Sequence, residues 1–237
     1  MDQKLRTPNS ELRTGLFIMI EGTDGSGKGT QTDILVDKLK SLDKGVEQIS
    51  FPQYGEPSAF LVEQYLNGKY GSASEVGPKK ASILYAVDRF AAAGKIKSWL
   101  EEGKIVIANR YVASNMGHQG GKIKDRTERK NYFDWNYDLE YNILEIPKPS
   151  VNIILHVTPE ISQQLVDMKD KREYLGDKKR DIHEDDINHL RDAETAYLEI
   201  AKMYSEFKLI ECVKDGQILP KDQIHGIIWE EVQKHIN

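Results

Sequence analysis

Short apolar runs recur along the chain, and each is followed by a segment whose apolar residues repeat at helical spacing. Such short runs are typical of strands that are buried on both faces of a parallel sheet. The expected strands are 16–21, 46–51, 104–108, 151–157 and 207–213. Strands that alternate with helices predict an α/β fold of three α/β/α layers, in which helices cover both faces of a five-stranded parallel sheet.

The helices are expected between and after these strands. The first follows a Gly-rich turn, and its apolar side is predicted to consist of Ile34, Leu35, Leu39 and Leu42. Later helices are expected at 57–66, 81–102, 127–144, 159–168, 187–204 and 224–236. Residues 1–14 are polar and of mixed charge, so we expect a flexible leader followed by one domain over residues 15–237.

Composition narrows the class of protein. The net charge is −5 with 39% hydrophobic residues, which does not favour a nucleic-acid-binding protein. No apolar run approaches the roughly 20 residues that a membrane span needs, so no membrane association is expected. The one cysteine, Cys212, lies in an apolar run and is expected in the core, which fits a reducing cytoplasm.

A glycine-rich loop carries the strongest chemical signal. Residues 22–30 follow a predicted strand and open a predicted helix, as a phosphate-binding loop does. Backbone N–H groups there can surround phosphate, Lys28 can neutralise the β- and γ-phosphates of ATP, and Thr30 can bind Mg²⁺. The predicted ATP-binding residues are Gly22, Asp24, Gly25, Ser26, Gly27, Lys28, Gly29 and Thr30. A plain turn is the alternative interpretation.

Several further motifs, in order, resemble the thymidylate kinase family. They are Phe51-Pro52, Tyr85 to Phe90, Asn109-Arg110-Tyr111 with Ser114 and His118 to Gly120, Leu139 to Asn142 with Pro147-Lys148-Pro149, and Asp181 to Glu184. The sequences and spacing of these motifs are most similar to those of the thymidylate kinases of Gram-positive bacteria. The resemblance implies a P-loop, nucleoside monophosphate kinase architecture with a mobile lid. It also implies a homodimer that transfers the terminal phosphoryl group of ATP to dTMP, with Mg²⁺ as cofactor.

The resemblance also assigns the nucleoside half of the acceptor site. Asp24 matches a carboxylate near the sugar 3′-hydroxyl, Tyr85 an aromatic that stacks on thymine, and Arg89 an arginine that hydrogen-bonds the base carbonyl. Tyr85 and Arg89 are four residues apart, which places them on one helix face. The alternatives are that Asp24 caps the helix, that Tyr85 is a core residue and that Arg89 pairs with Asp88 or a neighbour.

The remaining acceptor contacts follow the third predicted strand. Arg110 matches the arginine that binds the acceptor phosphate. A guanidinium suits that role because it can donate two parallel hydrogen bonds to phosphate oxygens. Ser114 and Gln119 match polar residues around the base, and Phe51 is expected to line the same pocket. A surface salt bridge for Arg110 and ordinary loop positions for the other polar residues are the alternatives. His118 is expected to be a wall residue of the pocket.

The predicted lid is a dense charge run at about 169–184. It resembles the bacterial lid whose arginines close over the transferred phosphate, which makes Arg172 and Arg180 the candidates for catalysis beside Lys28 and Arg110. The eukaryotic form instead has an arginine in the phosphate loop, where this chain has Gly25. A solvated charge run is the alternative interpretation.

Two positions depart from the family pattern. Asn109 stands where the family usually has Asp, so the predicted metal site of Thr30 and Asn109 lacks a carboxylate. Tyr54 stands where better-studied members have an arginine, which leaves more of the acceptor phosphate to Arg110. Another pyrimidine nucleoside monophosphate kinase, or a catalytically impaired nucleotide-binding homologue, therefore remains an alternative.

Overall fold

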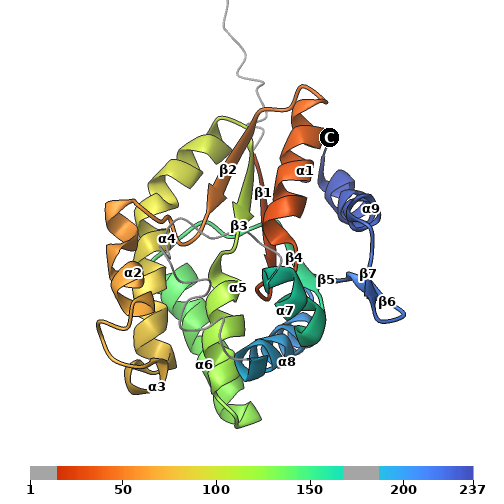
Figure 1. Ribbon diagram of the computed structural model, residues 1–237. Coiled ribbons are helices and arrows are strands. Elements are labelled where there is room, and N and C mark those ends of the chain that lie inside the picture. The colour runs from red at the N-terminus through yellow and green to blue at the C-terminus, as the bar shows by residue number, and fades with distance from the viewer. Residues whose placement is uncertain (1–14, 168–186, 237) are drawn as a thin grey trace, which may run out of the picture.

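Five parallel strands form the centre of the molecule (Figure 1). The computed structural model describes residues 15–167 and 187–236. Within them the sheet has the order β2-β3-β1-β4-β5. The strands are β1 (Leu16–Gly22), β2 (Val46–Ser50), β3 (Ile105–Asn109), β4 (Val151–His156) and β5 (Phe207–Glu211). The predicted α/β fold with a five-stranded parallel sheet is therefore confirmed.

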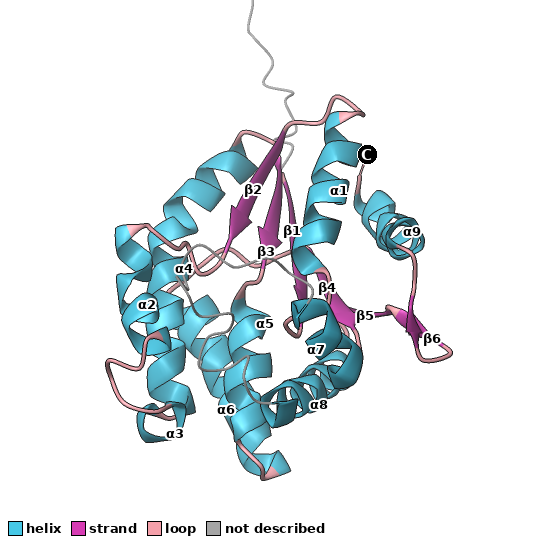
Figure 2. Ribbon diagram, viewed as in Figure 1, coloured by secondary structure: helices cyan, strands magenta, loops and turns pink. Residues whose placement is uncertain are grey.

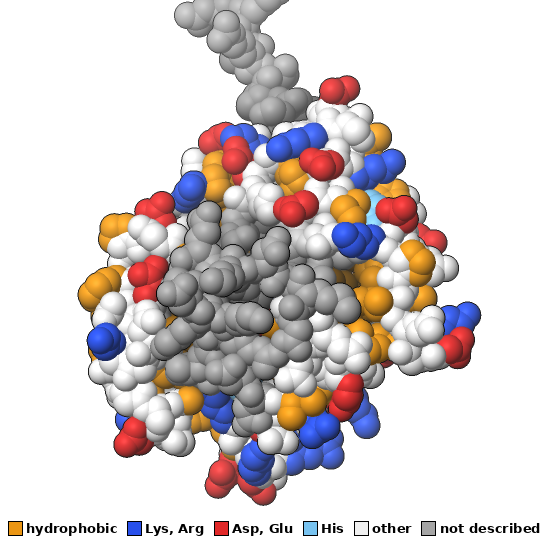
Figure 3. Space-filling view, viewed as in Figure 1, with side chains coloured by type: hydrophobic (Ala, Val, Ile, Leu, Met, Phe, Trp, Pro, Cys, Tyr) orange, Lys and Arg blue, Asp and Glu red, His pale blue; other side chains and the backbone are white. Residues whose placement is uncertain are grey.

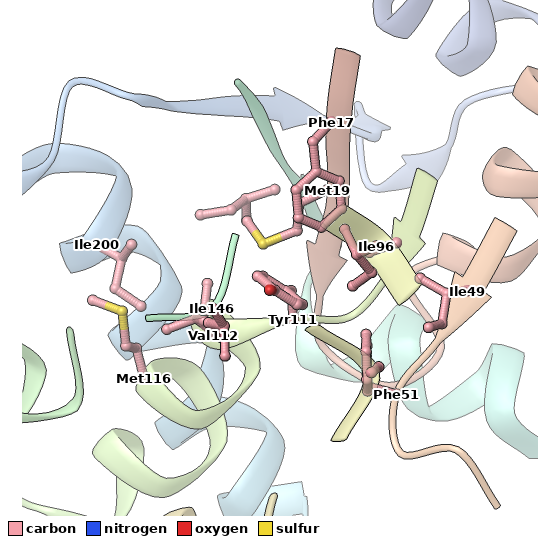
Figure 4. Close-up of a cluster of buried hydrophobic side chains, with 14 of the residues drawn as sticks. Phe17, Met19, Ile49, Phe51, Ile96, Tyr111, Val112, Met116, Ile146 and Ile200 are labelled. Carbon is pink, nitrogen blue, oxygen red and sulfur yellow. The ribbon is translucent and has the colours of Figure 1, made fainter. Parts of the chain in front are cut away.

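Alternate residues of β1 divide the core into two halves, one on each face of the sheet. Phe17 and Met19 pack with α4 (Pro78–Glu101) and α8 (Ile187–Met203), in the cluster drawn in Figure 4. Ile18 and Ile20 pack on the opposite face with α1 (Lys28–Lys40) and α9 (Lys221–Val232). Side chains alternate across a strand, so a strand such as β1, which is apolar from Leu16 to Ile20, needs helices on both faces (Figure 2).

Shorter elements fill the connections. They are a 3₁₀ turn at Pro57–Ala59, α2 (Phe60–Leu66), α3 (Ala73–Val76), α5 (Val112–Ser114), a π-helical turn at Asn115–Gln119, a 3₁₀ turn at Gly120–Lys122, α6 (Arg126–Tyr137), a π-helical turn at Asp138–Ile143, α7 (Pro159–Asp167) and a 3₁₀ turn at Gln233–His235. The helix expected at 127–144 is thus α6 followed by the wider π-helical turn.

Two details of the sequence prediction are wrong. The first helix ends at Lys40, so Leu42 is 44% exposed instead of lying on the apolar face. The fifth strand ends at Glu211, and β6 (Val213–Lys214) then pairs with β7 (Gln217–Ile218) in a hairpin. Asp215 and Gly216, which join them, have φ values of 52° and 73°, as the two central residues of a type I′ turn require. Cys212 is fully buried, as expected.

The visible surface carries charges of both signs. On the face shown in Figure 3, acidic and basic side chains are interspersed and do not gather into a patch of one sign. No described helix is long and apolar enough to cross a membrane.

Candidate active site

The phosphate loop joins β1 to α1 and leaves the helix N-terminus without a side-chain cap. Gly27 occupies the N-cap position at φ 85°, and because glycine has no side chain, no side-chain group there accepts a hydrogen bond from the first turn. The backbone N–H groups of the first turn of α1 and the positive end of the helix dipole can therefore bind a phosphate oxygen. The hydroxyl of Ser26 is buried and has no hydrogen-bond partner among the described residues. The loop therefore offers several polar groups that a bound phosphate can satisfy.

Gly25 lies where the loop touches α7. Its φ is 79°, and a Cβ atom there would lie 2.2 Å from the carbonyl oxygen of Ser162. The Ser162 hydroxyl lies 3.3 Å from the Thr23 hydroxyl, so α7 supports the loop by a second contact. The backbone of α7 therefore leaves no room for any side chain at residue 25, including an arginine.

Lys28 lies over the carbonyl side of the loop. Its ammonium donates to Gly22 O at 3.0 Å and to Thr23 O at 2.7 Å, and the residue is 7% exposed. These contacts hold the positive charge beside the helix N-terminus, at the carboxyl edge of the sheet. The position agrees with the role predicted for Lys28, while its contact with ATP remains a prediction.

Arg110 reaches the loop from the end of β3. Its backbone adopts the left-handed conformation at φ 67°, which turns the chain sharply at the carboxyl edge of the sheet. Nη2 donates to Asp24 Oδ1, and Nη1 donates to His118 Nε2 at 2.8 Å. Burial opposes the charge of Arg110, but Asp24 raises the pKa of the guanidinium, which stays cationic. The structure thus brings Asp24 and Arg110 together across 86 residues of sequence.

Asn109 is the last residue of β3 and lies beside the phosphate loop. Its Oδ1 is buried without a hydrogen-bond partner among the described residues, and its Nδ2 would lie 3.9 Å from a Cβ atom at Gly29. An amide oxygen of this kind and the Thr30 hydroxyl are ligands that Mg²⁺ accepts. The described residues contain no group of three His, Cys, Asp or Glu that could hold a metal alone. Asn109 Oδ1 and the Thr30 hydroxyl therefore fit Mg²⁺ as ligands beside the phosphate oxygens of a nucleotide.

Arg89 is only 1% exposed and forms an ion pair with Glu140, which is fully buried. Nε and Nη2 both donate to the Glu140 carboxylate, the second at 2.7 Å. Burial opposes the charge of Arg89, but Glu140 raises its pKa. Asp88 is not the partner, because it accepts instead from Gln53 and Ser58. The alternative that pairs Arg89 with Asp88 is wrong, whereas pairing with a more distant residue is what the structure shows.

Asn115 links this ion pair to its surroundings. Its Nδ2 donates to Glu140 Oε1 at 3.1 Å and to Asn136 Oδ1 at 3.2 Å. Tyr85 is partly buried and meets Tyr65 edge to face at 6.2 Å between ring centroids. Tyr85 and Arg89 lie on one turn of α4, so their predicted roles at one base remain compatible with their placement.

Glu21 organises the residues that follow β3, and the sequence analysis did not identify it. Its buried carboxylate accepts from the Tyr111 and Ser114 N–H groups, from the Ser114 hydroxyl at 2.7 Å and from the Tyr197 hydroxyl at 2.9 Å. Burial raises the pKa of Glu21, and the hydrogen bond from Ser114 is the largest effect against it. A carboxylate that ends an apolar strand was the only sequence signal for this role.

The other predicted residues are distributed around this centre. The Ser114 hydroxyl is used by Glu21, and Gln119 Oε1 accepts from Lys122 at 2.7 Å, so contacts of either residue with a base remain predictions. Phe51 is buried against Tyr111, with 5.6 Å between ring centroids. Tyr54 is 38% exposed. Arg172 and Arg180, with the rest of the expected lid, lie outside the described residues, as does the expected leader.

Similar proteins place this site in a known class. The chain is 29% identical to a thymidylate kinase of Mycobacterium tuberculosis, over 78% of this chain and 86% of the relative. It is 26% identical to that of Bacillus licheniformis, over 93% and 98% of the two chains. The solved structure of thymidylate kinase from Candida albicans superposes with a TM-score of 0.70 at 24% identity, over 94% of this chain and 92% of that one, which supports the fold.

A model of the whole family gives the assignment. The thymidylate kinase model matches residues 20–217, a range that begins at the end of β1 and runs to the hairpin after β5. The match includes the phosphate loop, Arg110 and the Arg89–Glu140 pair, all of which the structure places at one end of the sheet or beside it. The chain belongs to the thymidylate kinase family, whose members are phosphotransferases that act on dTMP.

Proposed function

We propose that the dTMP kinase reaction takes place at the carboxyl edge of the sheet, with ATP on the phosphate loop and the acceptor phosphate against Arg110. The observation that carries the proposal is the contact between Asp24 and Arg110. It joins the loop that holds Lys28 to the end of β3, so donor and acceptor groups converge on one place. Ligands of open α/β sheets bind at this edge of the strands.

The protein's part in phosphoryl transfer is mainly positioning and charge. Lys28 would leave the loop carbonyls for the phosphate oxygens of ATP, and loop N–H groups would bind the same phosphates. Arg110 would hold the acceptor phosphate in line with the transferred group and offset the charge that builds up between them. The acceptor phosphate is anionic near neutral pH, so its oxygen attacks without a strong general base.

Recognition of the nucleoside would use residues on both sides of Arg110. Asp24 can accept from the sugar hydroxyl, Tyr85 can stack on thymine, and Nη1 of Arg89 can donate to a base carbonyl, since Glu140 occupies its other nitrogens. Gln119, Ser114 and Phe51 complete the proposed pocket. Thymine differs from uracil by one methyl, which is worth about 1–3 kcal/mol, so dUMP should be a weaker substrate.

Asn109 Oδ1 and the Thr30 hydroxyl would hold Mg²⁺ on the donor side of the site. A divalent cation there neutralises the phosphates of ATP and favours in-line transfer. Asn109 contributes no negative charge, so the metal would depend more on ATP itself than in a relative with Asp. We expect Asn109→Asp to lower the Mg²⁺ concentration needed for half-maximal activity.

The lack of space at Gly25 also helps to distinguish the bacterial from the eukaryotic form of the family. Because a side chain at residue 25 would meet Ser162 O, a second arginine has to come from elsewhere in the chain. Arg172 and Arg180 remain the candidates on sequence grounds alone. This supports the bacterial arrangement of the family over the eukaryotic one, whereas the Gram-positive kind rests on the sequence resemblance alone.

A homodimer through α4 is the arrangement that the surface supports. Ile83, Val87 and Phe90 lie on one side of α4 and are each 40–52% exposed, and Phe60 on α2 is 56% exposed. Large apolar side chains that are exposed together on neighbouring helices indicate a protein interface. We expect sedimentation to show a dimer that Phe90→Glu dissociates; a monomeric wild-type chain would contradict this.

The function is tested by ADP release with ATP, Mg²⁺ and each of dTMP, dUMP, UMP, CMP and AMP. We expect turnover with dTMP above all others. Preference for another monophosphate would keep the reaction and reject the acceptor. No turnover by the wild type, with dTMP activity in Asn109→Asp, would make the chain an impaired member of the family. No ADP release by either the wild type or Asn109→Asp would favour a protein that binds nucleotides without kinase activity.

A further inference from the structure

His118 lies at the end of the π-helical turn that follows α5, and it contacts Arg110 directly. Its Nε2 lies 2.8 Å from Arg110 Nη1, and its Nδ1 lies 3.4 Å from His189 Nε2 on α8. The His189 ring stacks at 25° to it, and the Tyr197 ring meets it edge on at 5.8 Å between centroids. The imidazole is therefore held on several sides, and one of its contacts is the arginine of the acceptor site.

The hydrogen bond fixes the protonation of His118. A guanidinium only donates, so Nε2 has to be the acceptor and the proton of the neutral ring is on Nδ1. Nδ1–H then points to His189 Nε2, which accepts in turn. Burial, followed by the positive charge of Arg110, lowers the pKa of His118 well below its ordinary 6.5, against the opposing effect of Asp24. The ring is therefore neutral at physiological pH.

We propose that His118 is a positioning residue for Arg110, because its Nε2 and the Asp24 carboxylate accept from two different nitrogens of one guanidinium and so fix its plane. A single acceptor would leave the planar group free to turn about that contact. Two acceptors on Nη1 and Nη2 remove this freedom before the acceptor phosphate arrives, which lowers the ordering cost of binding.

A histidine at this position also leaves the net charge of the Asp24–Arg110 pair unchanged. Asp24 already balances the charge of Arg110, and a second carboxylate in place of His118 would leave the pair with a net negative charge facing a phosphate. A neutral imidazole gives the same geometric restraint without adding negative charge. The inference rests on the proposed role of Arg110 at the acceptor phosphate, and it assigns to His118 more than the wall position expected from the sequence.

The test compares three replacements that differ in where they place an acceptor. Glutamine can place an amide oxygen near the Nε2 position, asparagine is too short to do so, and phenylalanine keeps the ring but has no acceptor. A lost hydrogen bond to a charged group corresponds to about a ten- to hundredfold change in affinity. We therefore expect His118→Phe and His118→Asn to raise KM for dTMP at least about tenfold, with KM for ATP unchanged. We expect His118→Gln to stay within about threefold.

Calorimetry with thymidine and with dTMP supplies the readout that a loss of packing would not produce. We expect His118→Phe to weaken dTMP but not thymidine, because only dTMP presents a phosphate to Arg110. His235→Phe, in the C-terminal 3₁₀ turn, controls for loss of an imidazole elsewhere and should change neither affinity. Equal losses for both ligands, or no difference between glutamine and phenylalanine, would overturn the inference.

A double-mutant cycle separates this inference from the proposed function. If Arg110→Ala raises KM for dTMP and His118→Phe adds nothing to it, both proposals stand. If Arg110→Ala has its effect and His118→Phe has none in the wild type, only the positioning role fails. If Arg110→Ala leaves dTMP affinity unchanged, the proposed acceptor site itself fails.

Discussion

The proposed donor and acceptor halves of the site are built in different ways. The phosphate loop is one continuous segment, and backbone N–H groups and a lysine from the same nine residues would provide its chemistry. The proposed acceptor half is assembled from side chains far apart in sequence, in the pair Arg89–Glu140 and in the pair of Arg110 with Asp24, which reaches over from the phosphate loop. A local loop depends on backbone conformation, whereas an assembled pocket depends on buried charges that need their partners.

The sharpest way to break the acceptor half is to leave Arg89 unpaired. Glu140→Ala removes the only carboxylate that Arg89 contacts among the described residues, and it also removes an acceptor of Asn115. An unpaired charge in the interior costs about 3–5 kcal/mol, so we expect the free energy of unfolding in urea to fall by that amount.

Two controls show whether burial causes the effect. Glu47→Ala breaks the half-exposed pair with Lys104 and should cost about 0–1 kcal/mol. The double change Arg89→Met with Glu140→Met should cost less than Glu140→Ala alone, since it leaves no unpaired charge. If the double variant were less stable than Glu140→Ala, the buried ion pair would not be the reason.

The donor half was predictable from sequence because its residues are contiguous. The order of Gly22 to Thr30 after an apolar strand predicts both the loop and the helix that it opens, and the same patterning predicts the sheet. Arg89, by contrast, could be assigned to a base only by resemblance. Its partner lies 51 residues away, and no spacing rule connects two charges at that separation.

The same limit explains the other omissions. Glu21 binds groups at residues 111, 114 and 197, which meet only after β1, β3 and α8 have packed together. The hairpin after β5 did carry a local signal, because Asp215-Gly216 is a preferred type I′ pair, but the neighbouring apolar run suggested a longer strand. The long-range partners of Glu21 could not be predicted from the sequence. The turn at Asp215-Gly216 could have been, but the apolar run before it favoured a longer fifth strand.

The donor half should be most sensitive to its backbone. Gly25→Ala introduces a Cβ atom at a left-handed residue and within 2.2 Å of Ser162 O, so we expect about 1–3 kcal/mol lower stability and a raised KM for ATP. Gly226→Ala on α9 is the matched control. Its Cβ would meet nothing within 4 Å, and a glycine inside a helix costs about 0.5–1 kcal/mol relative to alanine, so stability should rise. Equal effects of both changes would refute the backbone argument.

A smaller effect is expected at His156, which ties β4 to α8 and β5 away from both halves. Burial lowers the pKa of His156, but the hydrogen bonds to Glu211 and Glu194 outweigh burial. The net effect is a pKa above the ordinary 6.5. Stability from its charge is therefore complete below pH 6.5 and is lost as the pH rises through the raised pKa. We expect His156→Gln to cost about 1 kcal/mol at pH 6 and less at pH 9. A loss that grows with pH would contradict the sign.

The division into two halves is tested most directly by calorimetric titration of Lys28→Ala and Arg110→Ala with a non-hydrolysable ATP analogue and, separately, with dTMP. Each variant removes a charged donor from one half, which corresponds to about ten- to hundredfold in affinity. We predict that Lys28→Ala weakens only the ATP analogue and that Arg110→Ala weakens only dTMP. Equal weakening of both ligands by either folded variant, or unchanged dTMP affinity in Arg110→Ala, would contradict the account.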